Sequence, residues 1–266
     1  MNNKEAGRFA LWFSLPMAVL VAIASTAGIS IPAVYANETR ISAAEFAGVD
    51  VFNLVAAVPA LLISAELFRR GSLAGRLVWT GTVMYVVYAY IFYTLDVHFN
   101  ALFLVYCALW GLSFYTLLWS LPSLAVPEIA RLYGPGAPRR ATAALFFWIA
   151  LSVGARWMIE YIPAIGSGRV PHSLVELGSF TDPAAVLDLS LLLPALVIAA
   201  IMILRRRPLG FVLGPVLLTF AVLVFVMLDF LLGCLNLRGL GPGYAPLVIS
   251  SVQAAAGMAL LAVFFR

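Results

Sequence analysis

Charged residues are scarce in this chain. Only 11% of its 266 residues are charged and 64% are hydrophobic, whereas an ordinary soluble domain carries about 25% charged residues. A chain with so little polar surface cannot remain soluble as a folded globule in water. The sequence therefore predicts an integral membrane protein, with the lipid bilayer as its first partner.

Residues that carry common cofactor and catalytic chemistry are also few. Lys4 is the only lysine, and the chain contains no Walker A motif, no GxGxxG run and no GxSxG nucleophile elbow. His98 and His172 are the only histidines, and no HxH, HxxxH or HExxH spacing supports them, so they are weak metal candidates and no cofactor can be named. The net charge of +4 is interpreted as a topology signal, and nucleic acid is not expected as a partner.

The two cysteines, Cys107 and Cys234, do not form a CxxC motif. Both are expected in the outer half of the membrane or near its outer surface, where a disulfide is one alternative. We favour the other alternative, in which two free thiols pack as small apolar groups.

Long hydrophobic runs, by contrast, are abundant, and charged residues divide them into eight segments. Most of these segments meet the roughly 20 residues that are needed to cross a hydrocarbon core of about 30 Å. The predicted spans cover residues 9–34, 49–68, 77–97, 101–124, 143–164, 184–204, 208–232 and 245–265. The expected fold class is an all-α integral membrane protein with eight transmembrane helices, and residues 36–48 and 165–183 are expected as its two longer outer connections.

Basic residues indicate the orientation of these spans. With the N-terminus inside, twelve of the sixteen Lys and Arg residues are cytoplasmic, and four fall outside: Arg40, Arg156, Arg169 and Arg238. Eight spans then place both the N- and the C-terminus in the cytoplasm. Because arginine strongly outnumbers lysine in an Ala-, Gly- and Leu-rich chain, the expected location is the cytoplasmic (inner) membrane of a bacterium with a GC-rich genome.

The two halves of the sequence share landmarks in the same order. The matches are Ile31-Pro32-Ala33 with Ile162-Pro163-Ala164, Val58-Pro59-Ala60-Leu61 with Leu193-Pro194-Ala195-Leu196, Arg69-Arg70 with Arg205-Arg206, and 92–96 with 225–229. They predict an internal duplication: two parallel four-helix repeats, residues 1–126 and 143–266, joined by a cytoplasmic linker at 127–142 that contains the helix-breaking run 134–138. Because each repeat has an even number of spans, a pseudo-two-fold axis is expected along the membrane normal.

Carboxylates gather on the predicted outer side. Nine of the twelve lie there: Glu38, Glu45, Asp50, Asp96, Glu160, Glu176, Asp182, Asp188 and Asp229. The repeat pairs Asp96 with Asp229, and the alignment of Pro59 with Pro194 places Asn53 opposite Asp188. Such positions would line an acidic cavity that opens outward. The alternative is that each acid caps a helix or lies among lipid headgroups, and this reading is favoured for Glu38, Glu45 and Asp50.

The fifth span carries Arg156 and Glu160 at positions i and i+4, where an ion pair is expected. A buried arginine needs a carboxylate, and Asp188 or Asp96 on another helix is the alternative partner. The repeat places Ser25 and Ile29 at the matching positions of the first span. The two halves therefore differ here, and the pair is interpreted either as part of a functional site or as a structural bridge between helices.

The third span carries a stripe of polar and aromatic residues at helical spacing: Tyr85, Tyr88, Phe92, Asp96 and Asn100. Tyr90 and Tyr93 lie off this stripe. Aromatic hydroxyls that lead to a carboxylate would suit an organic cation or a ring-bearing ligand. Ordinary helix packing with tyrosines at the membrane interface is the alternative that we favour.

Together these features favour a membrane protein that binds or transports a small solute or cation in an acidic outer cavity, and no motif identifies a characterised family. The candidate site residues are Asn53, Tyr88, Asp96, Arg156, Glu160, Asp188 and Asp229. One alternative is an enzyme that acts at the outer leaflet, which we favour less, and another is a non-catalytic subunit with protein partners in a membrane complex. The predicted inner halves of the spans are almost wholly apolar apart from Glu66, which argues against a complete transport path.

Overall fold

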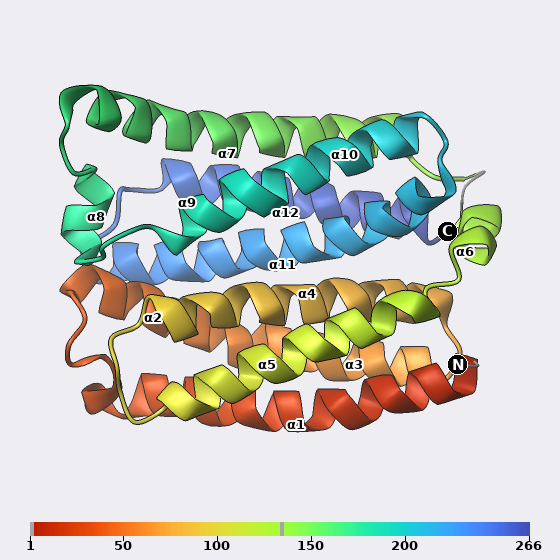
Figure 1. Cartoon of the computed structure of the whole chain (residues 1–266), viewed down its shortest axis with the longest axis horizontal. Coiled ribbons are helices and arrows are strands. Elements are labelled where there is room, and N and C mark those ends of the chain that lie inside the picture. The colour runs from red at the N-terminus through yellow and green to blue at the C-terminus, as the bar shows by residue number, and fades with distance from the viewer. Residues whose placement is uncertain (1–2, 134–135) are drawn as a thin grey trace.

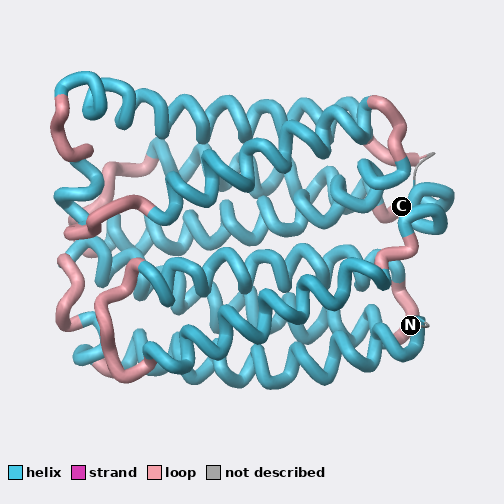
Figure 2. Tube along the Cα trace, in the orientation of Figure 1, coloured by secondary structure: helices cyan, strands magenta, loops and turns pink. Residues whose placement is uncertain are grey.

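The computed structural model describes residues 3–133 and 136–266, and within them every regular element is a helix. Eight helical segments are long and apolar enough to cross a membrane, which confirms the predicted number of spans and a multi-pass membrane protein. They lie side by side in a bundle, with the loops gathered at its two ends (Figure 2). Figure 1 places the two chain ends at the same end of the bundle.

Each half of the chain contributes four spans. The first four are α1 (Asn3–Ser30); α2 (Arg40–Phe52), η2 (Asn53–Ala57) and α3 (Val58–Arg69) as one span; α4 (Leu73–Leu95); and α5 (Phe103–Ser120). The last four are α7 (Arg139–Ser167); α9 (Pro183–Leu187), η4 (Asp188–Leu192) and α10 (Leu193–Leu204) as one span; α11 (Pro208–Leu237); and α12 (Ala245–Phe264). Four short elements lie in the connections: η1 (Pro32–Tyr35), η3 (Leu121–Ser123), α6 (Val126–Tyr133) and α8 (His172–Leu177).

We call the two ends of the bundle the terminal end, which holds the chain ends and α6, and the distal end. The distal end carries the connections 31–39, 96–102, 168–182 and 238–244. Of the predicted linker 127–142, residues Gly134 and Pro135 lie outside the described residues.

The predicted span boundaries differ from the observed ones by several residues in places, and the largest difference is at the start of the second span. The second span begins at Arg40, whereas residues 36–48 were expected as an outer connection. The helix starts there because Thr39 is a favourable N-cap, and its hydroxyl accepts a hydrogen bond from the Ser42 backbone N–H at 3.2 Å. Because the helix starts earlier than predicted, Asp50 lies well inside it, ten residues after its first residue, Arg40.

Two of the spans contain a π-helical turn, and both turns end immediately before a Val-Pro or Leu-Pro step. In η2 the Val58 N–H bonds to the Asn53 carbonyl, and in η4 the Leu193 N–H bonds to the Asp188 carbonyl. Pro59 and Pro194 cannot donate a backbone hydrogen bond, and their rings would clash with the carbonyl four residues earlier. A wider turn relieves both problems, so the proline explains why the helix expands at these two places.

The two sets of four helices meet chiefly through α2, α4 and α11, which run side by side in the middle of the bundle (Figure 1). Glycines permit this close approach. A Cβ at Gly48 of α2 would lie 2.8 Å from the Leu231 Cα, and a Cβ at Gly81 of α4 would lie 2.6 Å from the Val216 carbonyl oxygen. Small residues at such contacts are how membrane helices pack tightly.

Candidate functional site

Asp188 lies at a junction of three elements. It opens the π turn η4 and is 7% exposed. The Tyr88 hydroxyl of α4 donates to its Oδ1 at 3.2 Å, and the Trp157 Nε1–H of α7 donates to its Oδ2 at 3.0 Å. The structure thus brings together two of the predicted site residues, Tyr88 and Asp188, from opposite halves of the chain.

Arg156 does not pair with Glu160, contrary to the expected i, i+4 bridge. Its guanidinium carbon lies 4.1 Å from the centre of the Trp157 ring, on the exposed side of α7. Glu160 instead accepts a hydrogen bond from the Ser173 backbone N–H of α8 at 3.0 Å. The physical reason is that the connection after α7 brings the first turn of α8 to Glu160 and offers it a backbone donor. Arg156 still lies within electrostatic range of Asp188 and Glu45.

The matched acids Asp96 and Asp229 have separate partners. Asp96 follows the last residue of α4 and accepts from the Ser179 hydroxyl at 2.8 Å. Asp229, inside α11, accepts from the hydroxyls of Ser250 and Ser251 on α12, the latter at 2.9 Å. Both acids therefore hold neighbouring segments to their own helices.

Asn53 matches Asp188 in position and in bonding. It opens the π turn η2, as Asp188 opens η4, and its Oδ1 accepts the Tyr85 hydroxyl at 2.8 Å. Tyr85 and Tyr88 are three residues apart on α4. One face of this helix therefore donates a tyrosine hydroxyl to the first residue of each π turn.

A pocket of about 500 Å³ opens beside η4 at the distal end. Its walls are mostly apolar, and its polar groups centre on Asp182, whose Oδ2 accepts the Tyr161 hydroxyl at 3.1 Å. Oδ1 of Asp182 caps α9 by accepting the N–H groups of Ala184 and Ala185. The lining residues are Tyr161, Pro171, Leu174, Thr181, Asp182, Ala185, Val186, Leu189 and Ser190.

Several carboxylates surround this region without forming ion pairs among the described side chains. Asp182 and Asp188 lie within electrostatic range of each other, and Glu45 of α2 lies within range of Asp96 and Asp182. Salt bridges of Glu66 with Arg69 and Arg70 and of Glu38 with His98 lie elsewhere, whereas Glu176 of α8 pairs with His172. The distal end near η4 therefore carries a net negative potential, which attracts cations.

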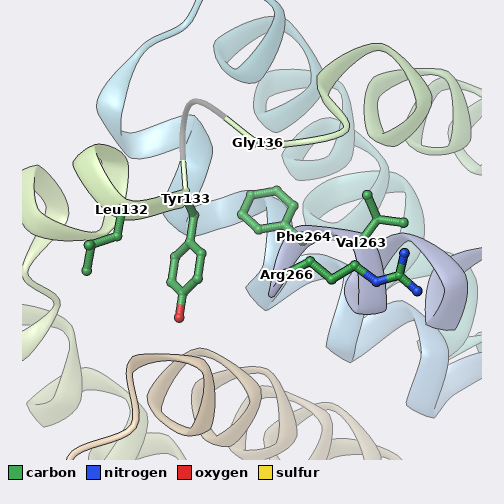
Figure 3. A pocket seen from close by; sticks show the side chains of 6 residues that line it. All are labelled: Leu132, Tyr133, Gly136, Val263, Phe264 and Arg266. Carbon is green, nitrogen blue, oxygen red and sulfur yellow. The ribbon is translucent and has the colours of Figure 1, made fainter.

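A second pocket, of about 390 Å³, lies at the terminal end between α6 and the end of α12 (Figure 3). Leu132 and Tyr133 form one side, and Val263, Phe264 and Arg266 the other. None of the described side chains that line it is acidic, and the charged one among them, Arg266, extends away from Tyr133. This pocket does not suit a cation.

Histidines and cysteines do not form a site in the described part of the chain. His98 contacts Glu38, with Nδ1 3.0 Å from Oε2, and His172 lies 3.4 Å from Glu176 in α8. No group of three or more metal-ligating side chains was found among residues 3–133 and 136–266. Cys107 and Cys234 are free thiols, so a disulfide does not join them.

Sequence reasoning missed a second buried acid, Asp50, which was expected to cap a helix or lie among headgroups. It is fully buried within the first four spans, where the hydroxyls of Tyr35 and Tyr93 donate to it. Sequence reasoning also missed the position of Asp182 in the wall of the distal pocket. The density of tyrosines between residues 85 and 106 was the available signal for Asp50, but Tyr93 was set aside because it lies off the predicted stripe.

Comparison with protein-family models, curated proteins and solved structures found no match for this chain.

The environment of Asp96 predicts a pH effect on stability. Burial raises the pKa of this carboxyl, partly offset by the Ser179 hydrogen bond. The folded state therefore holds the proton more tightly than the unfolded chain, so stability falls as the pH rises from about 4 through the folded pKa. Asp96→Asn keeps the acceptor for Ser179 and is expected to raise Tm at pH 7, with the gain shrinking toward pH 4.

Thermal unfolding of both proteins across this pH range tests the prediction. Glu176→Gln, which removes an exposed carboxylate of α8, serves as the control and should follow the wild-type profile. Parallel Tm profiles for the wild type and Asp96→Asn would show that Asp96 carries no such penalty.

Proposed function

We propose that the protein consists of two parallel four-helix repeats, residues 1–126 and 143–266, joined by the linker 127–142 in a bacterial inner membrane. The π turns support the duplication, because Asn53 and Asp188 open them at the same distance from Pro59 and Pro194. The positive-inside rule supports a cytoplasmic terminal end, because twelve of the sixteen basic residues belong to it. The distal end then faces the extracytoplasmic side.

We further propose that the protein binds a small cationic, amphipathic solute from this side. The observation that carries the proposal is the apolar distal pocket with Asp182 in its wall. The buried Asp188 is the first residue of η4, whose next two residues also line this pocket. Apolar walls with a few convergent polar groups are typical of small-molecule sites. Leu174 and Leu189 would contact the apolar part of the solute, and the two carboxylates would attract its positive charge.

Other predicted site residues take supporting roles in this proposal. Tyr88 and Trp157 hold the Asp188 carboxylate in place through hydrogen bonds. Arg156, stacked on Trp157, competes with the cationic solute for electrostatic attraction to this carboxylate. The more distant acids Asp96, Glu160 and Asp229, whose hydrogen bonds join helices or connections, add to the negative potential of the distal end. Asn53 is the neutral counterpart of Asp188 in the other half.

Binding is favoured over complete transport. Glu66, the one acid noted in the inner halves of the spans, is partly exposed at the terminal end and pairs with Arg69 and Arg70 at 2.6 and 2.7 Å. It is therefore unavailable to a path through the bundle. A site reached from the distal end alone fits this arrangement.

The proposal predicts saturable binding of tetraphenylphosphonium, a lipophilic cation, to the protein in lipid nanodiscs, measured by isothermal titration calorimetry. Asp182→Asn and Asp188→Asn are each expected to raise Kd about tenfold, which corresponds to about 1.4 kcal/mol. Asparagine is as good an N-cap as aspartate, so Asp182→Asn removes the charge and keeps the start of α9.

Glu176→Gln is the matched control, since it removes the same charge from an exposed position at the same end of the bundle. Its Kd should change less than about twofold. Absence of saturable binding to the wild type, or equal weakening by Glu176→Gln, would contradict a specific site at Asp182 and Asp188.

A further inference from the structure

Asp50 is the most completely enclosed carboxylate in the described part of the protein. Its exposed fraction is 0%, and it lies in α2, three residues before the first residue of the π turn η2. The Tyr35 hydroxyl donates to Oδ2 at 2.6 Å and the Tyr93 hydroxyl donates to Oδ1 at 2.8 Å. No described Lys, Arg or His lies within ion-pair distance of it.

A second group of hydroxyls surrounds this carboxylate without partners of its own. Ser25 of α1, Tyr90 of α4 and Tyr106 of α5 are at most 1% exposed, and their hydroxyl groups make no hydrogen bond in the described structure. Ser25 lies beside Asp50 and Tyr90, and Tyr106 lies beside Tyr35, just outside hydrogen-bonding geometry. Buried polar groups without partners are uncommon and call for an explanation.

The shape of α1 matches this arrangement. A Cβ at Gly28 would collide with Oδ2 of Asp50 and would lie 2.7 Å from the Tyr35 hydroxyl oxygen. Only glycine leaves room for the Tyr35–Asp50 hydrogen bond at this point. Since not even a methyl group fits here, the space beside Oδ2 does not suit a hydrated cation.

An isolated ionised carboxylate is costly at this depth, and a charge is tolerated inside a membrane protein only when it is compensated. The titratable groups that face Asp50 are all tyrosines: Tyr35 from η1, Tyr85, Tyr90 and Tyr93 from α4, and Tyr106 from α5. The nearest α1 groups are Ser25 and Gly28, and α11 meets α2 through Phe230 and Leu231 at Gly48. None of these groups supplies a positive charge.

We propose that Asp50 is a proton-binding site that is loaded from the distal end through the hydroxyl of Tyr35. In the loading step, Tyr35 passes its hydroxyl proton to Oδ2 of Asp50 and takes a proton from a hydronium ion in the water at the distal end, which becomes a water molecule. One O–H bond forms on the carboxylate, the tyrosine is restored, and the site changes from one negative charge to neutral. The step needs no co-reactant other than this hydronium ion.

The position of Tyr35 suits this role. It lies in η1, in the distal connection 31–39, and is 8% exposed, whereas Tyr93 is 1% exposed. Burial and the charge of Asp50 both raise the pKa of the Tyr35 phenol, so it keeps its proton at physiological pH and acts as a donor. Asn100 ties this connection to the next one, since its Nδ2 donates to the Val34 carbonyl at 3.2 Å. The unpartnered hydroxyls of Tyr106 and Ser25 flank the route.

Infrared difference spectroscopy of the protein in nanodiscs, recorded as external pH is changed, tests the proposal. The wild type is expected to show the carbonyl stretch of one protonated carboxylic acid that Asp50→Asn removes. Tyr35→Phe removes the donor to Oδ2, and is expected to move the titration midpoint by about one pH unit or more and to slow loading. Tyr115→Phe, at an exposed tyrosine of α5, is the control and should leave the signal unchanged.

Three outcomes would overturn the proposal: a spectrum of Asp50→Asn identical to that of the wild type, a Tyr35→Phe variant that titrates like the wild type, or loss of the signal on addition of Na⁺ at constant pH. The last result would assign the site to a metal cation. Should Asp50→Asn fail to fold, the Tyr35→Phe and Tyr93→Phe titrations decide the question. The measurement is made without tetraphenylphosphonium, so its result is independent of the proposed solute site.

Discussion

Replacement of Gly81 by isoleucine is expected to force α4 away from α11 and to lower the free energy of unfolding by more than about 3 kcal/mol. A Cβ at this position would lie 2.6 Å from the Val216 carbonyl oxygen and 2.7 Å from the Thr219 Cβ. Neither atom can rotate away, because one belongs to the backbone and the other is fixed by it. The Thr219 hydroxyl also donates to the Pro215 carbonyl at 2.8 Å, which holds its side chain in place.

The same substitution at Gly111 provides the control. Gly111 lies in α5, and a Cβ there would meet nothing described within 4 Å, so Gly111→Ile is expected to change stability by less than about 0.5 kcal/mol. Thermal unfolding and size-exclusion chromatography in detergent measure both variants. A Gly81→Ile protein that elutes and melts like the wild type would show that α4 and α11 are not tightly packed in the membrane.

The number of spans could be predicted from sequence because a bilayer imposes a minimum length on every apolar helix. The start of α2 could not be predicted in the same way. Residues 40–48 contain Arg40 and Glu45, which break the hydrophobic run, yet Thr39 caps a helix there and α11 covers its apolar face. Hydropathy measures transfer into lipid, and it does not register a helix that is stabilised by contact with another helix.

The site was only partly predictable. The repeat identified Asn53 and Asp188 as equivalent, and both open a π turn and accept a hydroxyl from α4. The predicted Arg156–Glu160 ion pair was wrong. Helical spacing places the two side chains near each other, but it does not exclude a hydrogen-bond donor from another segment. Glu160 found one in the Ser173 N–H, on a segment whose fold the spacing could not reveal.

Asp50 shows a different limit. Its burial depends on tyrosines from three separate elements, and a pattern along one helix cannot show that they converge. Tyr85 and Tyr88 of the predicted stripe donate to Asn53 and Asp188, but Tyr93, which was set aside, donates directly to Asp50. A helix in the middle of a bundle has more than one face that makes polar contacts.

Removal of the Asp188 side-chain acceptors is expected to have the second large effect. Asp188→Leu leaves the Trp157 N–H and the Tyr88 O–H without their partner, and each unsatisfied buried donor costs about 1–3 kcal/mol. The free energy of unfolding should therefore fall by about 2–6 kcal/mol. Asp188→Asn keeps one acceptor oxygen, as Asn53 does for Tyr85. It should therefore lower the free energy of unfolding by the cost of one unsatisfied donor, about 1–3 kcal/mol.

A double-mutant cycle with Tyr88→Phe separates this effect from a simple change of shape. In the wild-type background Tyr88→Phe removes one hydrogen bond to Asp188 and should destabilise the protein by about 1 kcal/mol. In the Asp188→Leu background the hydroxyl is already unsatisfied, so its removal should be neutral or stabilising. Equal costs in the two backgrounds, measured by reversible unfolding in detergent, would mean that Tyr88 and Asp188 do not interact. Asp188 would then lie at the proposed site without a hydrogen bond from α4.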